Sequence, residues 1–267
     1  MHRLAVCIFA ASTLFAQVTG IGNVPPDLRF EVVSLKPSDP NPQPNSISGL
    51  RPSQGGQRYE AWNCTIRLMI QAAYRVKVEQ VAGGPSWLDS DRFDMEAKAE
   101  KPSSGDELHV MLMNLLVDRL QLKFHREQRE MSRYALGVDK GGPKLTPHEA
   151  SNGGDPWIDQ TSERFLQVKF KATFCPMDYL AFRLAQLLDR PVVDVTGLKG
   201  GYDFNLEFTR DLPPGIPETA RVNGDPIDTS GPTVFAAIKQ QLGLELKPDK
   251  GPVEVIVIDH AEKPAGN

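Results

Sequence analysis

The chain contains two stretches in which the same order of residue patterns recurs. Asn63-Cys64-Thr65-Ile66 introduces a helix, and Phe174-Cys175-Pro176-Met177 introduces another, with the two cysteines 111 residues apart. Behind each cysteine, the pattern indicates a helix, a strand that ends at glycines, a strand with an aromatic-Asp pair, a second helix and a closing pair of strands. The repeat therefore predicts two tandem modules of the same kind.

The residues at matching places support this interpretation. Apolar residues recur at i, i+3, i+4 and i+7 from Ile66 and again from Met177, as expected for amphipathic helices. Phe93-Asp94-Met95 matches Tyr202-Asp203-Phe204. Each module is predicted to run strand, helix, strand, strand, helix, strand, strand, and to end in a hairpin. This order predicts an α+β fold of small mixed sheets with helices on one face.

Composition shifts set the predicted boundaries. The first module is expected over residues 28–140, with an extra N-terminal strand, and the second over 164–267. Residues 141–163 are rich in glycine and polar residues and are predicted to form a linker. The prolines of residues 210–231 predict a loop insertion in the second module.

The N-terminus has the pattern of a secretory signal peptide. A basic start that includes Arg3 precedes a short apolar run, and small residues follow it. We expect a signal peptide over residues 1–16, with Gly20 as an alternative cleavage position, although a buried N-terminal helix would share this composition. A secreted or periplasmic location follows. The apolar run is shorter than the roughly 20 residues of a spanning helix, so no transmembrane segment is expected in the mature chain.

The charge of the chain bears on its partners. The formal net charge is −4, and no long run of Lys or Arg occurs. Proteins that bind nucleic acid usually carry a basic patch or stripe, so we expect no nucleic-acid partner. A protein or a cell-envelope component is the expected kind of partner.

Two cysteines remain after the predicted signal peptide, and both occupy the same place in the repeat. In an oxidising compartment Cys64 and Cys175 could form a disulfide between the modules, which would stabilise the fold by roughly 4 to 5 kcal/mol. Alternatively, both are small buried thiols. The sequence leaves the two alternatives open, because only the distance between the residues decides.

Seven short motifs stand in the order of a known family. They are Phe30-Glu31-Val32-Val33-Ser34-Leu35-Lys36-Pro37, Gly83-Gly84-Pro85-Ser86-Trp87, Gly141-Gly142-Pro143-Lys144-Leu145, Arg190-Pro191-Val192-Val193-Asp194-Val195-Thr196-Gly197-Leu198, Gly201-Tyr202-Asp203-Phe204, Gln241-Leu242-Gly243-Leu244 and Val257-Ile258-Asp259-His260. The chain resembles the soil-associated secreted proteins, a family expanded in Acidobacteria such as Solibacter. The resemblance implies an extracytoplasmic protein of uncharacterised activity, with related domains fused to membrane metallopeptidases of the β-lactam-sensor type. It supplies no catalytic residue, and the cysteines are outside its pattern.

Each module also resembles, by element order and by its Leu-Gly-Leu motif, the short N-terminal domain of secretins and TonB-dependent receptors. Those domains are periplasmic interaction modules. The resemblance implies a role in binding or assembly.

The sequence contains no familiar catalytic signature, phosphate-binding loop or metal-ligand spacing, and we predict no catalytic residue, metal site or cofactor. Gly83, Gly84, Pro85 and Trp87 form the best candidate binding surface, since glycines let a partner approach the backbone and Trp offers a large contact. The alternative is a tight turn whose Trp covers the core.

These observations favour a noncatalytic binding or assembly module. One alternative is an extracellular hydrolase whose site lies between the modules and uses Asp139, Asp259 and His260, since paired carboxylates can perform acid-base chemistry. Another is a domain that senses a ligand.

Overall fold

The computed structural model describes residues 25–39, 48–52, 56–149, 157–162, 165–213, 215–217, 219–222 and 224–264. The predicted signal peptide, residues 1–16 or up to Gly20, lies outside the described residues, so secretion stays a prediction. The fold is α+β, as predicted, and the described residues form three four-stranded sheets and one two-stranded sheet. We call residues 28–140 the first half and residues 141–264 the second half.

The elements follow one another in a mixed order. The strands are β1 (Val32–Pro37), β2 (Gly49–Pro52), β3 (Arg58–Thr65), β4 (Val81–Gly83), β5 (Arg92–Lys98), β6 (Lys123–Val138), β7 (Thr146–Pro147), β8 (Trp157–Thr161), β9 (Gln167–Cys175), β10 (Val192–Asp194), β11 (Tyr202–Thr209), β12 (Arg221–Val222), β13 (Asp225–Pro226) and β14 (Leu244–His260). The helices are α1 (Ile66–Tyr74), η1 (Val78–Gln80), α2 (Trp87–Ser90), α3 (Gly105–Leu120), α4 (Met177–Ala185), α5 (Val234–Ala237) and η3 (Ile238–Leu242).

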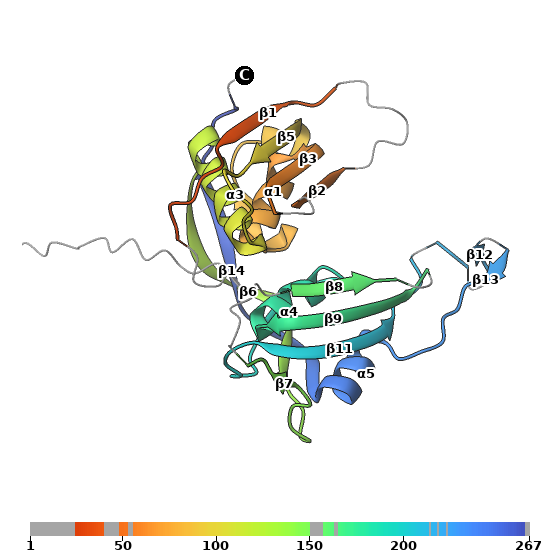
Figure 1. The fold of residues 1–267 in the computed structure, drawn as a ribbon. Helices are drawn as coiled ribbons and strands as arrows, with labels where there is room; N and C mark the ends of the chain where they lie inside the picture. Colours follow the sequence, from red (N-terminus) through yellow and green to blue (C-terminus); the bar gives the residue numbers. More distant parts are fainter. Residues whose placement is uncertain are drawn as a thin grey trace, which may run out of the picture.

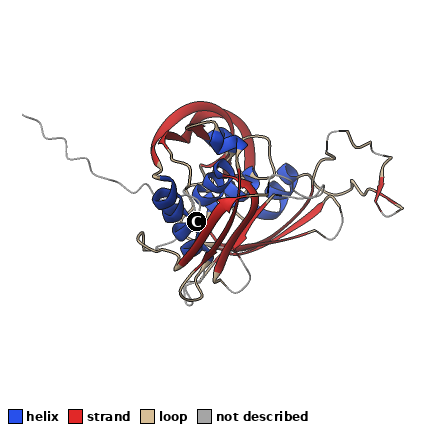
Figure 2. Cartoon of the chain, turned by 90° about the horizontal axis from the view of Figure 1, so that it is seen from above, coloured by secondary structure: helices blue, strands red, loops and turns tan. Residues whose placement is uncertain are grey.

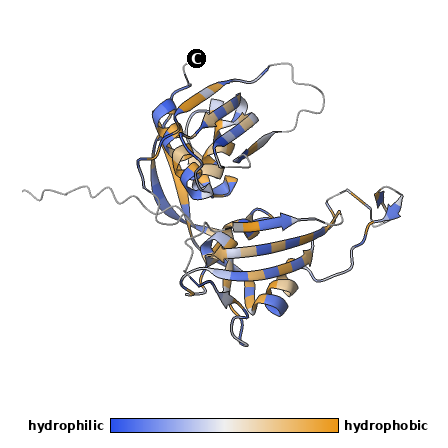
Figure 3. Ribbon diagram, in the orientation of Figure 1, coloured by the Kyte–Doolittle hydropathy of each residue, from blue (hydrophilic) through white to orange (hydrophobic). Residues whose placement is uncertain are grey.

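Two of the sheets have the same strand arrangement. The first sheet has the order β1-β5-β3-β2 and the second sheet the order β7-β11-β9-β8, and every pairing in both is antiparallel. Figure 1 shows them as two separate groups of strands. Polar and apolar residues alternate along β9 and β11 (Figure 3), so one face of the sheet can be buried while the other faces water.

The third sheet, which we call the central sheet, joins the two halves. Its order is β10-β6-β14-β4. β6 and β14 pair antiparallel along their whole length, from Val138 opposite Leu244 to Lys123 opposite His260. They form the long ribbon that runs between the two groups of strands in Figure 1, and Figure 2 shows from above that the longest strands of the molecule are curved.

The predicted terminal hairpins are therefore wrong. Each predicted pair of strands is one continuous strand of 16 or 17 residues, and its partner comes from the other half. Pro248 and Pro252 in β14 suggest a turn, but both pair with residues of β6. Both prolines are tolerated because β4 pairs with the outer edge of β14 only at Ile256–Ile258. Among the described residues no strand pairs with that edge at the prolines, so their missing N–H groups remove no hydrogen bond of the sheet.

The short strands of the central sheet are exchanged between the halves. β4, from the first half, pairs in parallel with β14, and β10, from the second half, pairs in parallel with β6. A backbone hydrogen bond also follows each long strand. After β14, the amide of Glu262 donates to Leu120 of the first half, at the end of α3 (2.7 Å). After β6, the amide of Lys144 donates to Leu242 within the second half (2.7 Å). Neither half contains a complete central sheet.

The predicted linker contributes to the second sheet. Residues 141–163 contain β7 and β8, which form its two edges. β7 takes the place in the second sheet that β1 takes in the first, which explains why β1 looked like an extra strand. The predicted insertion, residues 210–231, contains the small β12–β13 pair, which lies apart from the other sheets (Figure 1).

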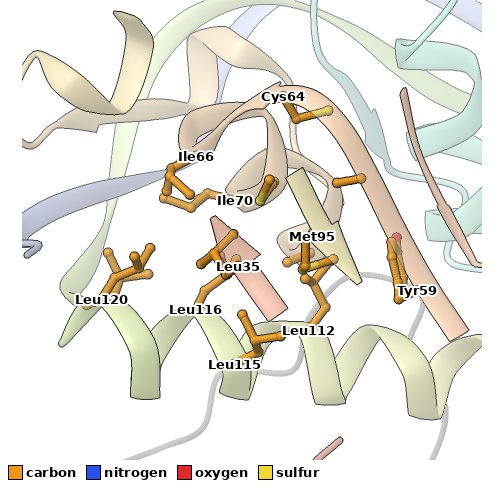
Figure 4. Close-up of a cluster of buried hydrophobic side chains, with 14 of the residues drawn as sticks. Leu35, Tyr59, Cys64, Ile66, Ile70, Met95, Leu112, Leu115, Leu116 and Leu120 are labelled. Carbon is orange, nitrogen blue, oxygen red and sulfur yellow. The ribbon is translucent and has the colours of Figure 1, made fainter. Parts of the chain in front are cut away.

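Each half supplies most of one apolar core, β14 and β6 add residues from the other half, and each core contains one of the two cysteines. Cys64 lies with Leu35, Ile66 and Met95 among side chains of the first sheet, α1 and α3 (Figure 4), while Cys175 lies in the core of the second half. Both cysteines are free and fully buried. Of the two alternatives for Cys64 and Cys175, the structure has the two buried thiols and not the disulfide, because each thiol lies in a different core. Burial raises the pKa of both thiols.

Candidate functional site

A pocket of about 280 Å³ lies where the two halves meet. Its lining comes from four places: the chain after α1, the helix α4, the strand β10, and the middle of the β6–β14 ribbon. Concave sites at the junction of structural units are common places for ligands. This pocket is therefore the candidate functional site.

The wall from the first half begins with Arg75, which ends α1 in the left-handed conformation (φ 52°). Its guanidinium is 3% exposed and forms an ion pair with Asp106 of α3, which is 2% exposed. The same guanidinium lies 4.9 Å from the centre of the Tyr179 ring, on α4 of the second half. Buried charge needs such partners, and here they come from both halves.

Lys77 fastens the same wall to the second half. Its ammonium donates to the backbone carbonyls of Ala185 (2.8 Å) and Leu188 (2.6 Å), at the end of α4. A cation at a helix C-terminus satisfies unpaired carbonyls and complements the helix dipole. Gln80 adds a link to the central sheet by donating to the carbonyl of Glu254 (3.1 Å).

The opposite wall consists of Asp178, Ala181, Phe182 and Ala185 of α4 together with the three residues of β10. Asp194, at the end of β10, accepts a hydrogen bond at Oδ1 from the amide of Thr196 (2.9 Å). Gln128 of β6 and Pro252–Glu254 of β14 complete the lining, and Arg126 pairs with the Glu254 carboxylate. The pocket thus combines apolar surface with charges of both signs.

Behind Arg75 lies an aromatic layer that contains His109 and Tyr59, with ring centres 5.6 Å apart. Burial and then the positive charge of Arg75 lower the pKa of His109 to about 4, so the imidazole is neutral at pH 7. Its Nδ1 contacts the Gly105 carbonyl (2.8 Å). Burial also raises the pKa of Tyr59. This layer supports Arg75 and stays uncharged.

The predicted binding loop lies elsewhere. Gly83 and Gly84 have positive φ values (70° and 78°), and a Cβ on Gly83 would lie 2.8 Å from the Ile258 carbonyl oxygen, so close packing of β4 on β14 requires glycine here. Trp87, at the start of α2, is half-buried against the first core, with its ring edge toward Phe93 (6.4 Å). None of Gly83, Gly84, Pro85 and Trp87 lines the pocket. Ligand contact by this loop stays a prediction.

The alternative hydrolase site is not assembled. Asp139 and Asp259 lie at opposite ends of the β6–β14 ribbon, which at about 3.4 Å per residue places them tens of ångströms apart. Lys239 pairs with Asp139 (3.1 Å) and, with nearby backbone amides, lowers the pKa of its carboxyl group. Asp259 pairs with His125 (2.9 Å). The prediction that Asp139, Asp259 and His260 converge is wrong.

The repeated aspartates have a structural role that the sequence did not reveal. Asp94 accepts the amide of Asn63 (2.9 Å), and Asp203 accepts that of Phe174 (2.8 Å). Asn63 and Phe174 both have positive φ (51° and 48°) and directly precede the core cysteines. Each aspartate therefore holds the kink that leads from a strand into a helix.

The pocket residues also escaped the sequence analysis. Arg75 and Lys77 follow an apolar helix as an isolated basic pair, and this is the one local signal that could have drawn attention to them. Asp106, the partner of Arg75, is more than 30 residues away along the sequence. Ala185 and Leu188, the partners of Lys77, are more than 100 residues away. Local patterns do not show such contacts.

With this geometry in place, the comparisons with known proteins identify a family. The sequence pattern of DUF3738, a family of proteins of unknown function, matches residues 67–261. The chain belongs to this family. The match runs from α1 to the end of β14, so the DUF3738 region includes every residue that lines the pocket. No curated protein and no solved structure matches the chain. Among the described residues, no helix combines the length and the apolar character needed to cross a bilayer.

Proposed function

We propose that this DUF3738 protein is an extracytoplasmic, noncatalytic binding protein whose small-molecule ligand occupies the pocket between the two halves. The observation that carries the proposal is the way the pocket is built. Its walls come from both halves, and they are linked by the cation-π contact of Arg75 with Tyr179 and by the hydrogen bonds of Lys77 to the end of α4. Preorganised walls favour binding because less conformational freedom is lost when the ligand enters.

The charged groups of the pocket are held by ion pairs and hydrogen bonds, which supports a binding role over a catalytic one. Arg75 is held by Asp106, Glu254 by Arg126, and Lys77 by two carbonyls. These contacts fix the position of each group, which suits recognition of a ligand.

The location of the protein and its wider relationships are part of the same proposal. The signal-peptide pattern of residues 1–16 supports export. The resemblances to the soil-associated secreted proteins and to the periplasmic interaction domains of secretins and TonB-dependent receptors also favour an extracytoplasmic binding protein. The shared strand order of the first and second sheets supports an origin of the two halves by duplication.

A ligand-capture experiment tests the pocket. Purified protein would be incubated with the small-molecule fraction of a cell-envelope extract, and bound compounds would be identified by native mass spectrometry. Val193→Tyr fills the pocket from β10, and Val195→Tyr, two residues along the chain at a 52% exposed position outside the lining, serves as the matched control.

We expect the wild type and Val195→Tyr to retain the same compound and Val193→Tyr to lose it. Equal retention by both variants would place the ligand elsewhere, and would direct attention to Trp87→Ala as the next variant. The absence of any retained compound would contradict the binding function itself.

A further inference from the structure

The charges that line the pocket indicate which chemical class of ligand it binds, and this inference rests on the proposed function. We propose that the pocket binds a small organic cation, a primary amine carried on a compact body of amino-acid size. The negative charge of Asp194 and the neighbouring carboxylates would hold the amine, and the apolar wall would cover the body.

The balance of charge favours a cation. Three carboxylates line the pocket, those of Asp178, Asp194 and Glu254, against the two cations Arg75 and Lys77. Arg75 is compensated by Asp106 and Glu254 by Arg126, and both partners lie outside the lining, so these two pairs leave the excess of one negative charge unchanged. The charge of Lys77 faces the carbonyl end of α4, where the helix dipole is negative. The pocket therefore has a net negative character, and a cationic ligand would complement it.

Asp194 is the carboxylate best placed to receive an amine. Its Oδ1 accepts the Thr196 amide, and no hydrogen bond to its Oδ2 occurs within the part of the chain that the structure describes. The backbone of β10 pairs with β6 at Asp194, and this pairing fixes the position from which the side chain extends. A hydrogen bond between an ammonium group and a carboxylate is stronger than one between neutral groups.

The remaining lining sets the size and the second contact of the ligand. A volume of about 280 Å³ lies near the lower end of the usual range for ligand pockets, which fits a single amino acid or a short peptide. Phe182, Val192 and Val253 provide apolar surface, and an aromatic ring near an ammonium group adds a cation-π contribution. Gln128, from β6, has an amide that can bond a carbonyl or carboxylate of the same ligand.

Isothermal titration with matched probes tests this ligand class. The probes are Nα-acetyl-lysine, whose single amine is on the side chain, Nα,Nε-diacetyl-lysine, which has no amine, and Nα-acetyl-glutamate, which places a carboxylate on the side chain. Asp194→Asn removes the negative charge with little change of shape. Asp159→Asn is the control, because Asp159 is an exposed carboxylate on β8, outside the pocket lining.

We expect Nα-acetyl-lysine to bind at least tenfold more tightly than the other two probes. Asp194→Asn should weaken this binding about tenfold, while Asp159→Asn leaves it unchanged. Preferential binding of Nα-acetyl-glutamate or Nα,Nε-diacetyl-lysine, sensitive to Val193→Tyr, would overturn the amine class and leave the pocket in place. Failure of all three probes to bind would also overturn the amine class, and the capture experiment with Val193→Tyr would then decide the binding function separately.

Discussion

The two halves place an aspartate at the same structural position and give it different second partners. Asp94 and Asp203 both accept the amide of a residue with positive φ that precedes a core cysteine. In the first half the second partner is the Ser38 hydroxyl (2.7 Å), and in the second half it is the imidazole of His148 (2.9 Å). The backbone contact is thus shared, and the side-chain contact varies.

A second difference concerns the end of the helix that follows each cysteine. α1 ends at the buried Arg75, whose charge is paired inside the first half, while α4 ends at the exposed Gln186 and has its carbonyls bound by Lys77 of the other half. The first half therefore stabilises both helix ends at the junction. This asymmetry makes the two halves unequal in spite of their common strand order, and the pocket lies where they differ.

The largest expected effect comes from separating the halves. We expect residues 25–149 and 157–264, produced as separate fragments, to lack cooperative unfolding when alone, because the central sheet takes strands from both. Mixed, the fragments should form a 1:1 complex with a cooperative transition, which circular dichroism and size-exclusion chromatography can measure. A fragment that folds alone with a sharp transition would show that the exchanged strands are dispensable for that half.

The exchange also shows what the sequence can and cannot predict. The apolar stripe that begins at Ile66 is a local pattern, and the helix that it predicts is present at Ile66–Tyr74. The pairing of β6 with β14 depends on residues more than 100 positions apart, and the prolines of β14 resemble a turn unless the open edge of the ribbon is known. The pocket was missed for the same reason, since Lys77 meets its carbonyl partners only through the fold.

The buried ion pair of the first half should give the next largest effect. Asp106→Ala leaves the Arg75 charge buried without its carboxylate, and we expect a loss of about 3–5 kcal/mol in the free energy of unfolding, measured by urea titration. Asp118→Ala is the control, because Asp118 pairs with Arg29 at about half exposure and should cost under about 1 kcal/mol. Equal losses for the two variants would show that Arg75 is hydrated in solution.

The residues that end the helices before β6 and β14 can be compared for the cost of a side chain in the left-handed conformation. Gly243 (φ 63°) and Gln121 (φ 47°) occupy equivalent left-handed positions. A Cβ on Gly243 would lie 2.1 Å from the Gly142 carbonyl oxygen. We expect Gly243→Ala to destabilise the protein by about 2–4 kcal/mol. Gln121→Ala keeps a Cβ at the equivalent position and should change stability by less than about 1 kcal/mol. Similar effects would mean that the second half can relax around residue 243.

The smallest expected effects are changes in stability with pH that come from His109 and Asp203. They occur in different pH ranges for the two halves. His109 has a pKa of about 4 in the folded protein and an ordinary value of 6.5, so the unfolded chain binds more protons between these values. The first half should lose stability as the pH falls from about 6.5 to 4, by on the order of 2 kcal/mol. His109→Gln should abolish this loss, as measured by urea titrations at a series of pH values.

In the second half the Phe174 amide, and then His148, hold the pKa of Asp203 below its usual value. Its contribution is therefore present above about pH 4 and is lost only as the pH falls through the lowered folded value. Because the carboxylate is 42% exposed, we expect the contribution to be under about 1 kcal/mol. Asp203→Asn should reduce the loss below pH 4, whereas His109→Gln should remove the loss between 6.5 and 4. If Asp203→Asn removed the loss in the higher range, the pair of Asp203 with His148, and not His109 alone, would set the acid response there.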